Sequence, residues 1–181
     1  MRFGLTCRSC GRTMPFRPGS TRCPCGGAVR VEYDLERIAA GLSRERLKER
    51  EATMWRYAEL LPVADPRRIV SLGEGWTPLV RLHHAERMLG LRGLWVKREE
   101  QNPTGSFKAR GFSCALTVAR GAGIRKVAVN SNGNAGSALA AYAARAGMEA
   151  YVFLPKDCPG LIVRECLDYG AHTCLVDGLI H

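Results

Sequence analysis

The sequence has no long hydrophobic run and carries none of several common enzyme motifs. No apolar stretch approaches the roughly 18 residues that a membrane-spanning helix needs. The opening residues, MRFGLTCRSCGR, lack the continuous apolar core of a secretory signal. There is no GxGxxG dinucleotide fingerprint, Walker phosphate loop, Ser/His/Asp order or paired-carboxylate arrangement. We therefore expect neither a membrane span nor a signal peptide, and no membrane partner.

Lysine is scarce although the chain is basic. Only five of the 27 basic residues are lysine, and the formal net charge is +10. Residues 1–60 carry 12 basic and 7 acidic residues, and residues 61–181 carry 15 and 10, so the charge is spread evenly. No basic block with interleaved aromatic residues stands out, as a surface that follows a nucleic-acid backbone would require. The charge favours solvated arginine faces and anionic small molecules over a nucleic-acid partner.

Cysteines gather at the N-terminus, where Cys7-x2-Cys10 is followed after twelve residues by Cys23-x-Cys25. Four thiolates from two glycine-bearing turns suit a closed, structural zinc site. The second pair is one residue tighter than the usual C-x2-C spacing, so a metal-free ribbon stays open. The other four of the eight cysteines are scattered among apolar neighbours, where we expect buried free thiols, and the whole pattern suits a reducing cytoplasm.

The chain divides into three expected parts: a zinc-ribbon-like module at 1–33, a helical segment and linker at 34–78 with Asp34 as N-cap, and an α/β region at 79–181. In the third part, strands are expected at 93–99, 126–131, 148–155 and 171–177. Helices are expected between them, at 106–121, 134–147 and 158–170. Four strands separated by three helices indicate βαβ units and one parallel sheet.

Two loops of this α/β region favour a ligand site. In QNPTGSFKARG, residues 101–111, Ser106 is the expected N-cap and Lys108 lies in the first helical turn. A helix N-terminus disfavours a cation, and a neutral lysine amine is a nucleophile that forms Schiff bases. The turn SNGNAG, residues 131–136, follows a strand and precedes a helix, which is where backbone amides hold a carboxylate or phosphate. Taken singly, the first loop favours a surface lysine and the second a polar turn; together they describe a cofactor site.

Four ordered motifs carry a family resemblance over essentially the whole chain. NPTGSFKARG resembles the lysine motif of fold-type II pyridoxal-phosphate enzymes, and SNGNAG resembles their S-x-G-N-x-G loop. MWRYAELLPV followed by SLGEGWTPL, and the N-terminal CxxCG…CxCGG…YDLE pattern, resemble the threonine synthase family. The resemblance implies a partial tryptophan synthase β-like α/β domain that binds pyridoxal phosphate.

The resemblance also implies roles for single residues. Lys108 would hold the cofactor covalently and then transfer protons, Phe107 would lie against the pyridine ring, and Asn134 would bond the ring's 3-hydroxyl oxygen. The substrate α-carboxylate would be cradled by Ser131, Asn132, Gly133 and the backbone at Ala135.

The implied reaction is the conversion of O-phosphohomoserine and water to threonine and phosphate. The substrate would thus be a phosphorylated amino acid. The family commonly has FKDRG where this chain has FKARG, with Ala109 in place of the aspartate. Related dehydratases have an apolar residue there, so a serine/threonine dehydratase or another amino-acid synthase stays open. A non-catalytic zinc-ribbon binding module is the alternative from a different class.

The family's glycine-rich phosphate-binding loop and the residue that faces the pyridine nitrogen come later in its chains, and neither is found here. The sequence is therefore expected to be the N-terminal part of such an enzyme, with little or no activity as this chain alone. A homodimer is left open by the resemblance.

Overall fold

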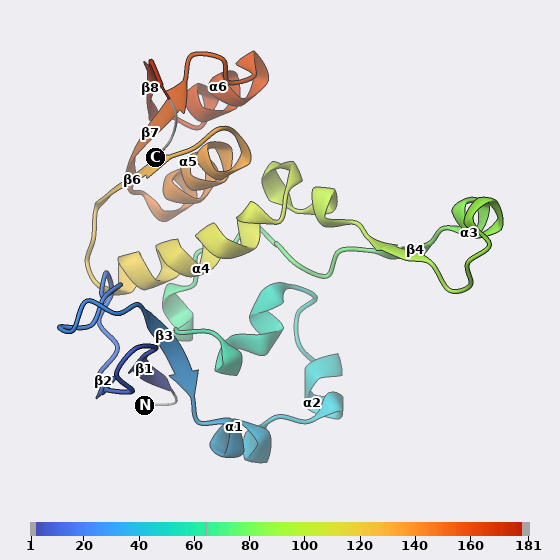
Figure 1. The fold of residues 1–181 in the computed structure, drawn as a ribbon, viewed down its shortest axis with the longest axis horizontal. Coiled ribbons are helices and arrows are strands. Elements are labelled where there is room, and N and C mark those ends of the chain that lie inside the picture. The colour runs from blue at the N-terminus through green and yellow to red at the C-terminus, as the bar shows by residue number, and fades with distance from the viewer. Residues whose placement is uncertain (1–2, 64, 179–181) are drawn as a thin grey trace.

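The computed structural model describes residues 3–63 and 65–178, which form four successive regions (Figure 1). A small antiparallel sheet and short helices lie on one side of the long helix α4, and a parallel sheet with its helices lies on the other. Within the described residues, no helix has the length and apolarity needed to cross a bilayer.

The N-terminal region is a three-stranded antiparallel sheet of order β2-β1-β3. Its strands are β1 Phe3–Cys7, β2 Thr13–Met14 and β3 Val29–Tyr33. Leu5 and Cys7 alternate inward along β1 and are buried, and the Phe3 ring meets the Phe16 ring edge-on at 5.2 Å. The four N-terminal cysteines lie at the end of β1, in the turn after it and in the turn before β3, and their sulfur atoms are close together.

The second region consists of short helical segments. These are α1 Leu35–Gly41, α2 Arg44–Lys48, and the 3-10 helices η1 Met54–Leu60 and η2 Pro66–Arg68. The expected N-cap is confirmed, because the Asp34 carboxylate accepts a hydrogen bond from the Arg37 amide at 3.0 Å. Ser43 caps α2 in the same way, so the expected helical segment is divided into short helices rather than one long helix.

An antiparallel arm follows, and it corrects part of the predicted topology. Strand β4 Leu79–Arg81 pairs with β5 Trp95–Lys97, and α3 His83–Leu89 lies between them at the end of an extension from the body (Figure 1). The strand expected at 93–99 therefore exists as β5 but does not join the parallel sheet. Because the chain reverses direction through α3, β5 pairs with β4, a strand that the sequence pattern did not reveal.

The remaining three strands form the predicted parallel sheet, in the order β6-β7-β8. They are β6 Lys126–Asn130, β7 Glu149–Pro155 and β8 His172–Val176. The helices are α4 Lys108–Gly121, α5 Asn134–Ala146 and α6 Gly160–Asp168, and two short 3-10 turns, η3 Glu99–Gln101 and η4 Pro103–Gly105, lead into α4. Each predicted helix and strand of this unit is confirmed within a few residues.

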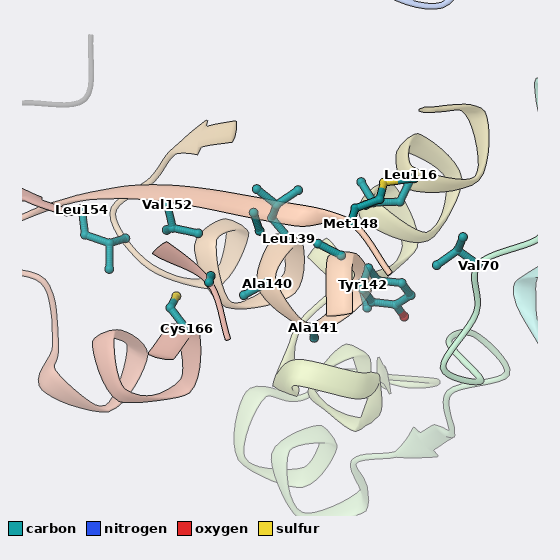
Figure 2. Close-up of a cluster of buried hydrophobic side chains, with 14 of the residues drawn as sticks. Val70, Leu116, Leu139, Ala140, Ala141, Tyr142, Met148, Val152, Leu154 and Cys166 are labelled. Atoms are coloured by element: carbon teal, nitrogen blue, oxygen red, sulfur yellow. The ribbon is translucent and has the colours of Figure 1, made fainter. Parts of the chain in front are cut away.

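The main core is centred on α5, whose residues Leu139 to Tyr142 point into it (Figure 2). This helix buries eight consecutive residues, from Gly136 to Ala143. Alanine and glycine let α5 approach β7 closely, and a Cβ added at Gly136 would lie 2.8 Å from Val152 Cγ1. Of the four downstream cysteines expected to be buried, Cys158 and Cys166 are, Cys114 is half-buried, and Cys174 is exposed on β8. The last of these expectations was wrong because β8 has a partner strand on one side only, within the described residues.

Candidate functional site

Lys108 is the first residue of helix α4, directly after a tight and unusual turn. Thr104 has a positive φ of 64°, which is uncommon for a residue with a branched side chain, and Gly105 follows with φ of 66°. The expected N-cap role of Ser106 is not seen: Phe107 occupies the N-cap position, and α4 has no side-chain cap. Instead the carbonyl of Ser106 accepts the Ala109 amide, and its hydroxyl turns into the protein interior.

The Lys108 side chain borders a hollow of about 360 Å³ lined by Phe107, Gly111, Phe112 and Ala115. The Lys108 amine lies 4.7 Å from the centre of the Phe107 ring, and Phe107 is 58% exposed. An aromatic face and a primary amine thus border one open space. Ala115 is exposed beside this space, whereas the polar residues Ser113 and Thr117 of the same helix are buried.

The second loop, 131–136, is a turn organised by one buried serine. The Ser131 hydroxyl oxygen accepts the amides of Gly133 at 3.0 Å and Gly136 at 3.1 Å. Asn134 begins α5 and is exposed, as is Asn132. The turn therefore presents two amide side chains and the N-terminus of α5 to solvent, which is the arrangement that binds a carboxylate.

The two loops lead into α4 and α5, which pack against each other. Helix α5, headed by Asn134, packs against both α4 and the η4 turn that precedes Lys108. Loop 131–136 also follows the carboxyl end of β6, where parallel sheets place their ligands.

Arg110 stabilises the lysine loop through an ion pair with Glu99. Its guanidinium donates two hydrogen bonds of 2.8 Å to the Glu99 carboxylate. Glu99 also accepts from the Thr77 hydroxyl at 2.7 Å and the Asn102 amide at 3.0 Å. Arg110 is thus a salt-bridged structural residue in the turn of α4 that carries Lys108. The Arg110 guanidinium, against an opposing effect of burial, lowers the pKa of Glu99 to about 2.

This pKa predicts an acid-labile contribution to stability. Because the folded-state value lies below the ordinary value of 4.5, the stabilisation is complete above about pH 4.5 and disappears as the pH falls towards 2. The side chain is 29% exposed, so we expect Glu99→Gln to lower the free energy of unfolding by about 1–2 kcal/mol at pH 6. Urea denaturation at pH 6 and pH 3 should show the difference from wild type shrinking at the lower pH. The control is Glu100→Gln, because Glu100 forms an exposed ion pair with Arg98. If Glu99→Gln and wild type differed in unfolding free energy by the same amount at both pH values, the low pKa of Glu99 would be contradicted.

The four N-terminal cysteines converge as their spacing predicts. Their sulfur atoms all lie within 4.8 Å of one another. Cys25 Sγ is 3.6 Å from Cys7 Sγ and 3.5 Å from Cys10 Sγ, and Cys10 Sγ is 3.8 Å from Cys23 Sγ. These separations are far beyond a disulfide bond. The structure therefore contains a compact cluster of four free thiols.

A comparison with protein families decides the identity of the α/β region. Residues 70–181 match the family described as pyridoxal-phosphate dependent enzyme. The chain belongs to this family. The match includes both loops described above and most of the segment that leads into them.

Curated relatives of this pyridoxal-phosphate-dependent enzyme are threonine synthases. That of Methanocaldococcus jannaschii is 43% identical over 173 residues, which are 95% of this chain and 43% of the relative. That of Methanosarcina acetivorans is 37% identical over 178 residues, 97% of this chain and again 43% of the relative. The chain thus spans less than half the length of these relatives.

Solved structures of the same family share the fold. A pyridoxal 5'-phosphate-dependent aspartate racemase is 35% identical, with a TM-score of 0.53 over 56% of this chain and 32% of its own. Maize serine racemase is 28% identical, with a TM-score of 0.53 over 57% and 32%. The mixed α/β architecture expected from the sequence is confirmed by these neighbours.

The residues around Lys108 fit the family's cofactor. Within the described parts of the chain, the hydroxyl oxygens of Thr104 and Ser106 are buried and have no hydrogen-bond partner. Buried hydroxyls without a partner are rare because each loses its hydrogen bonds to water. Two of them occur just before Lys108 and the exposed Phe107 ring. Pyridoxal phosphate has an aldehyde that suits the Lys108 amine and an aromatic ring that suits the Phe107 ring. Its polar groups can bond the hydroxyls of Thr104 and Ser106.

Sequence reasoning missed the buried polar residues behind the site. Glu74 is completely buried and bonded to both α4 and α5, and Glu99 holds the lysine loop through Arg110 and Asn102. No local signal marks Glu74, because in SLGEGWTP it lies between two glycines, as a solvated turn residue would.

Proposed function

We propose that this chain supplies the lysine and substrate-binding half of a threonine-synthase-type enzyme. The reaction is elimination of phosphate from O-phosphohomoserine followed by addition of water to give threonine. The observation that carries the proposal is the placement of Lys108 and Asn134 at the starts of two helices that pack together. The 43% identity to a threonine synthase supports the substrate class.

In this proposal Lys108 holds the cofactor through its amine and afterwards moves the protons of the reaction. Pyridoxal phosphate, when bound, stabilises the carbanions of the substrate. Phe107 would lie against the pyridine ring of the bound cofactor, and Asn134 would donate to its 3-hydroxyl oxygen. Ser131 shapes the 131–136 turn, so that Asn132, Gly133 and the Ala135 backbone receive the substrate carboxylate.

Ala109, where the family commonly has aspartate, lies outside the lining of the hollow beside Lys108. Ala109 is completely buried in the main core, so its methyl group packs and does not line the space beside Lys108. An amino-acid dehydratase uses the same cofactor chemistry and is the second candidate. Consumption of O-phosphohomoserine, as opposed to threonine, by the holoenzyme distinguishes the two.

We also propose that the cysteine cluster holds a structural zinc ion in a ribbon-like module at residues 1–33. A tetrahedral site with Zn–S bonds of about 2.3 Å separates its sulfurs by about 3.8 Å. The Cys7–Cys25, Cys10–Cys23 and Cys10–Cys25 sulfur–sulfur distances, 3.5 to 3.8 Å, agree with that spacing. Four thiolates fill the coordination sphere and leave no position for a reacting water, which supports a structural role. Residues 34–78 then connect this module to a catalytic α/β part at 79–181.

The test of the cofactor proposal is to add pyridoxal phosphate to the purified protein, reduce with borohydride, and map the modified lysine by mass spectrometry. We expect the label on Lys108 and little on the other four lysines. Even labelling of all five lysines would show that no selective site forms, and would overturn the proposal for this chain.

A further inference from the structure

The carboxylate of Glu74 is the most heavily hydrogen-bonded group of the interior. It is completely buried, and its two oxygens have five neutral donors as neighbours. Oε1 accepts from Trp55 Nε1 at 2.8 Å, the Ser71 hydroxyl at 3.0 Å and the Ser113 hydroxyl at 2.5 Å. Oε2 accepts from the Leu72 amide at 3.0 Å and the Tyr142 hydroxyl at 2.5 Å.

These donors come from separate parts of the chain. Trp55 belongs to η1, Ser113 to α4 and Tyr142 to α5. Burial alone would raise the pKa of Glu74, but the bonds from Ser113, Tyr142 and the Leu72 amide outweigh it and the pKa lies below its ordinary value. Burial and the adjacent carboxylate raise the pKa of Tyr142, so its hydroxyl remains a donor. The carboxylate is therefore an ionised acceptor shared by three elements.

The two helices held by Glu74 are those that begin with the proposed site residues. Ser113 follows Lys108 by five residues on α4, about 7.5 Å along the axis. Tyr142 follows Asn134 by eight residues on α5, about 12 Å along its axis. Because helices behave as rigid rods over such lengths, a contact at Ser113 and Tyr142 determines how the two helix starts face each other.

The backbone beside Glu74 adds a link to the lysine loop. The Gly75 amide donates to Asn102 Oδ1 at 2.9 Å, and Asn102 bonds Glu99, the partner of Arg110. Gly75 has a φ of 99°, and a Cβ there would lie 2.4 Å from the Met54 amide nitrogen. Only glycine therefore fits at this position, where the backbone next to Glu74 packs against Met54. The Glu74 carbonyl in turn accepts the Met54 amide at 2.8 Å.

We propose that Glu74 is a positioning residue, whose buried carboxylate sets the placement of Lys108 relative to Asn134 by holding α4 and α5 together. It lies in the interior and contacts neither the hollow beside Lys108 nor the exposed asparagines, so it acts through the helices and not on the substrate. This inference rests on the proposed roles of Lys108 and Asn134.

The first test is Glu74→Gln in the full-length holoenzyme of which this chain is one half. The matched control is Glu59→Gln, because Glu59 is a largely buried carboxylate bonded to Arg50 within the linking segment. A glutamine has the same shape but places an NH2 group against donors. We expect kcat to fall about 10–100-fold with KM changed less than about threefold, since small misplacements of reacting groups have such effects. The visible circular dichroism of the bound cofactor should change, at temperatures where the far-UV spectrum is that of folded protein. Glu59→Gln should leave kcat, KM and the visible circular dichroism at wild-type values.

Tyr142→Phe and Ser113→Ala each remove one donor and keep the carboxylate, so they test the proposal even if Glu74→Gln fails to fold. We expect smaller losses of kcat in the same direction, with a shifted cofactor band. Wild-type kcat and an unchanged band in both variants would overturn the positioning role. A wild-type protein without selective borohydride labelling of Lys108 would instead overturn the proposed function, so the two failures are distinguishable.

Discussion

In the full-length holoenzyme that combines this chain's half with the other half of the proposed enzyme, replacing Lys108 with alanine is expected to lower the rate of threonine formation at least about 10³-fold. The amine would serve both as the covalent attachment point of the cofactor and as the proton-transferring base, and no other lysine borders the hollow. Stability should change little, because the side chain is half-exposed and its contact is the face of the Phe107 ring.

The rate is measured in single-turnover and steady-state assays, with thermal unfolding recorded in parallel. Lys126→Ala is the matched control. Lys126 lies at the start of β6, is exposed, and forms an ion pair with Glu149 at the start of β7. Adding a small primary amine should restore part of the activity of the Lys108 variant, since the amine can supply the missing base. Wild-type activity in Lys108→Ala would remove the lysine from the mechanism.

Removing the metal from the cysteine cluster is expected to unfold the N-terminal sheet. Structural zinc contributes apparent free energies of about 10–16 kcal/mol in zinc-finger peptides. The small sheet has few buried apolar residues of its own, among them Phe3 and Leu5. Cys10→Ser, or a strong chelator, should therefore abolish the ordered β1–β3 pairing while the parallel sheet around β7 persists.

Elemental analysis should find one zinc ion per wild-type chain, and hydrogen exchange should show loss of protection in residues 3–33 of the variant. Cys174→Ser removes an exposed thiol outside the cluster and should change neither measurement. Protein purified without chelator that contains no zinc, yet keeps the N-terminal protection, would contradict the metal site.

The sequence by itself determined the elements whose signals are local. Alternating β-branched strands and alanine-rich helices predicted β6 to β8 and α4 to α6, because their periodicity follows from which face is buried. The Asp34 cap, the Lys108 motif and the 131–136 turn were predictable for the same reason: each is contained in a few consecutive residues. The cysteine spacing likewise predicted the cluster that the structure contains.

Only the tertiary structure decided what depends on distant partners. Glu74 meets Ser113 across 39 positions and Tyr142 across 68, and no local pattern distinguishes it from a solvated turn residue. The pairing of β5 with β4 was decided by the reversal through α3, and the inward turn of the Ser106 hydroxyl by the strained loop before it. A buried polar group needs a partner wherever the chain can supply one, and that partner is chosen by packing in three dimensions.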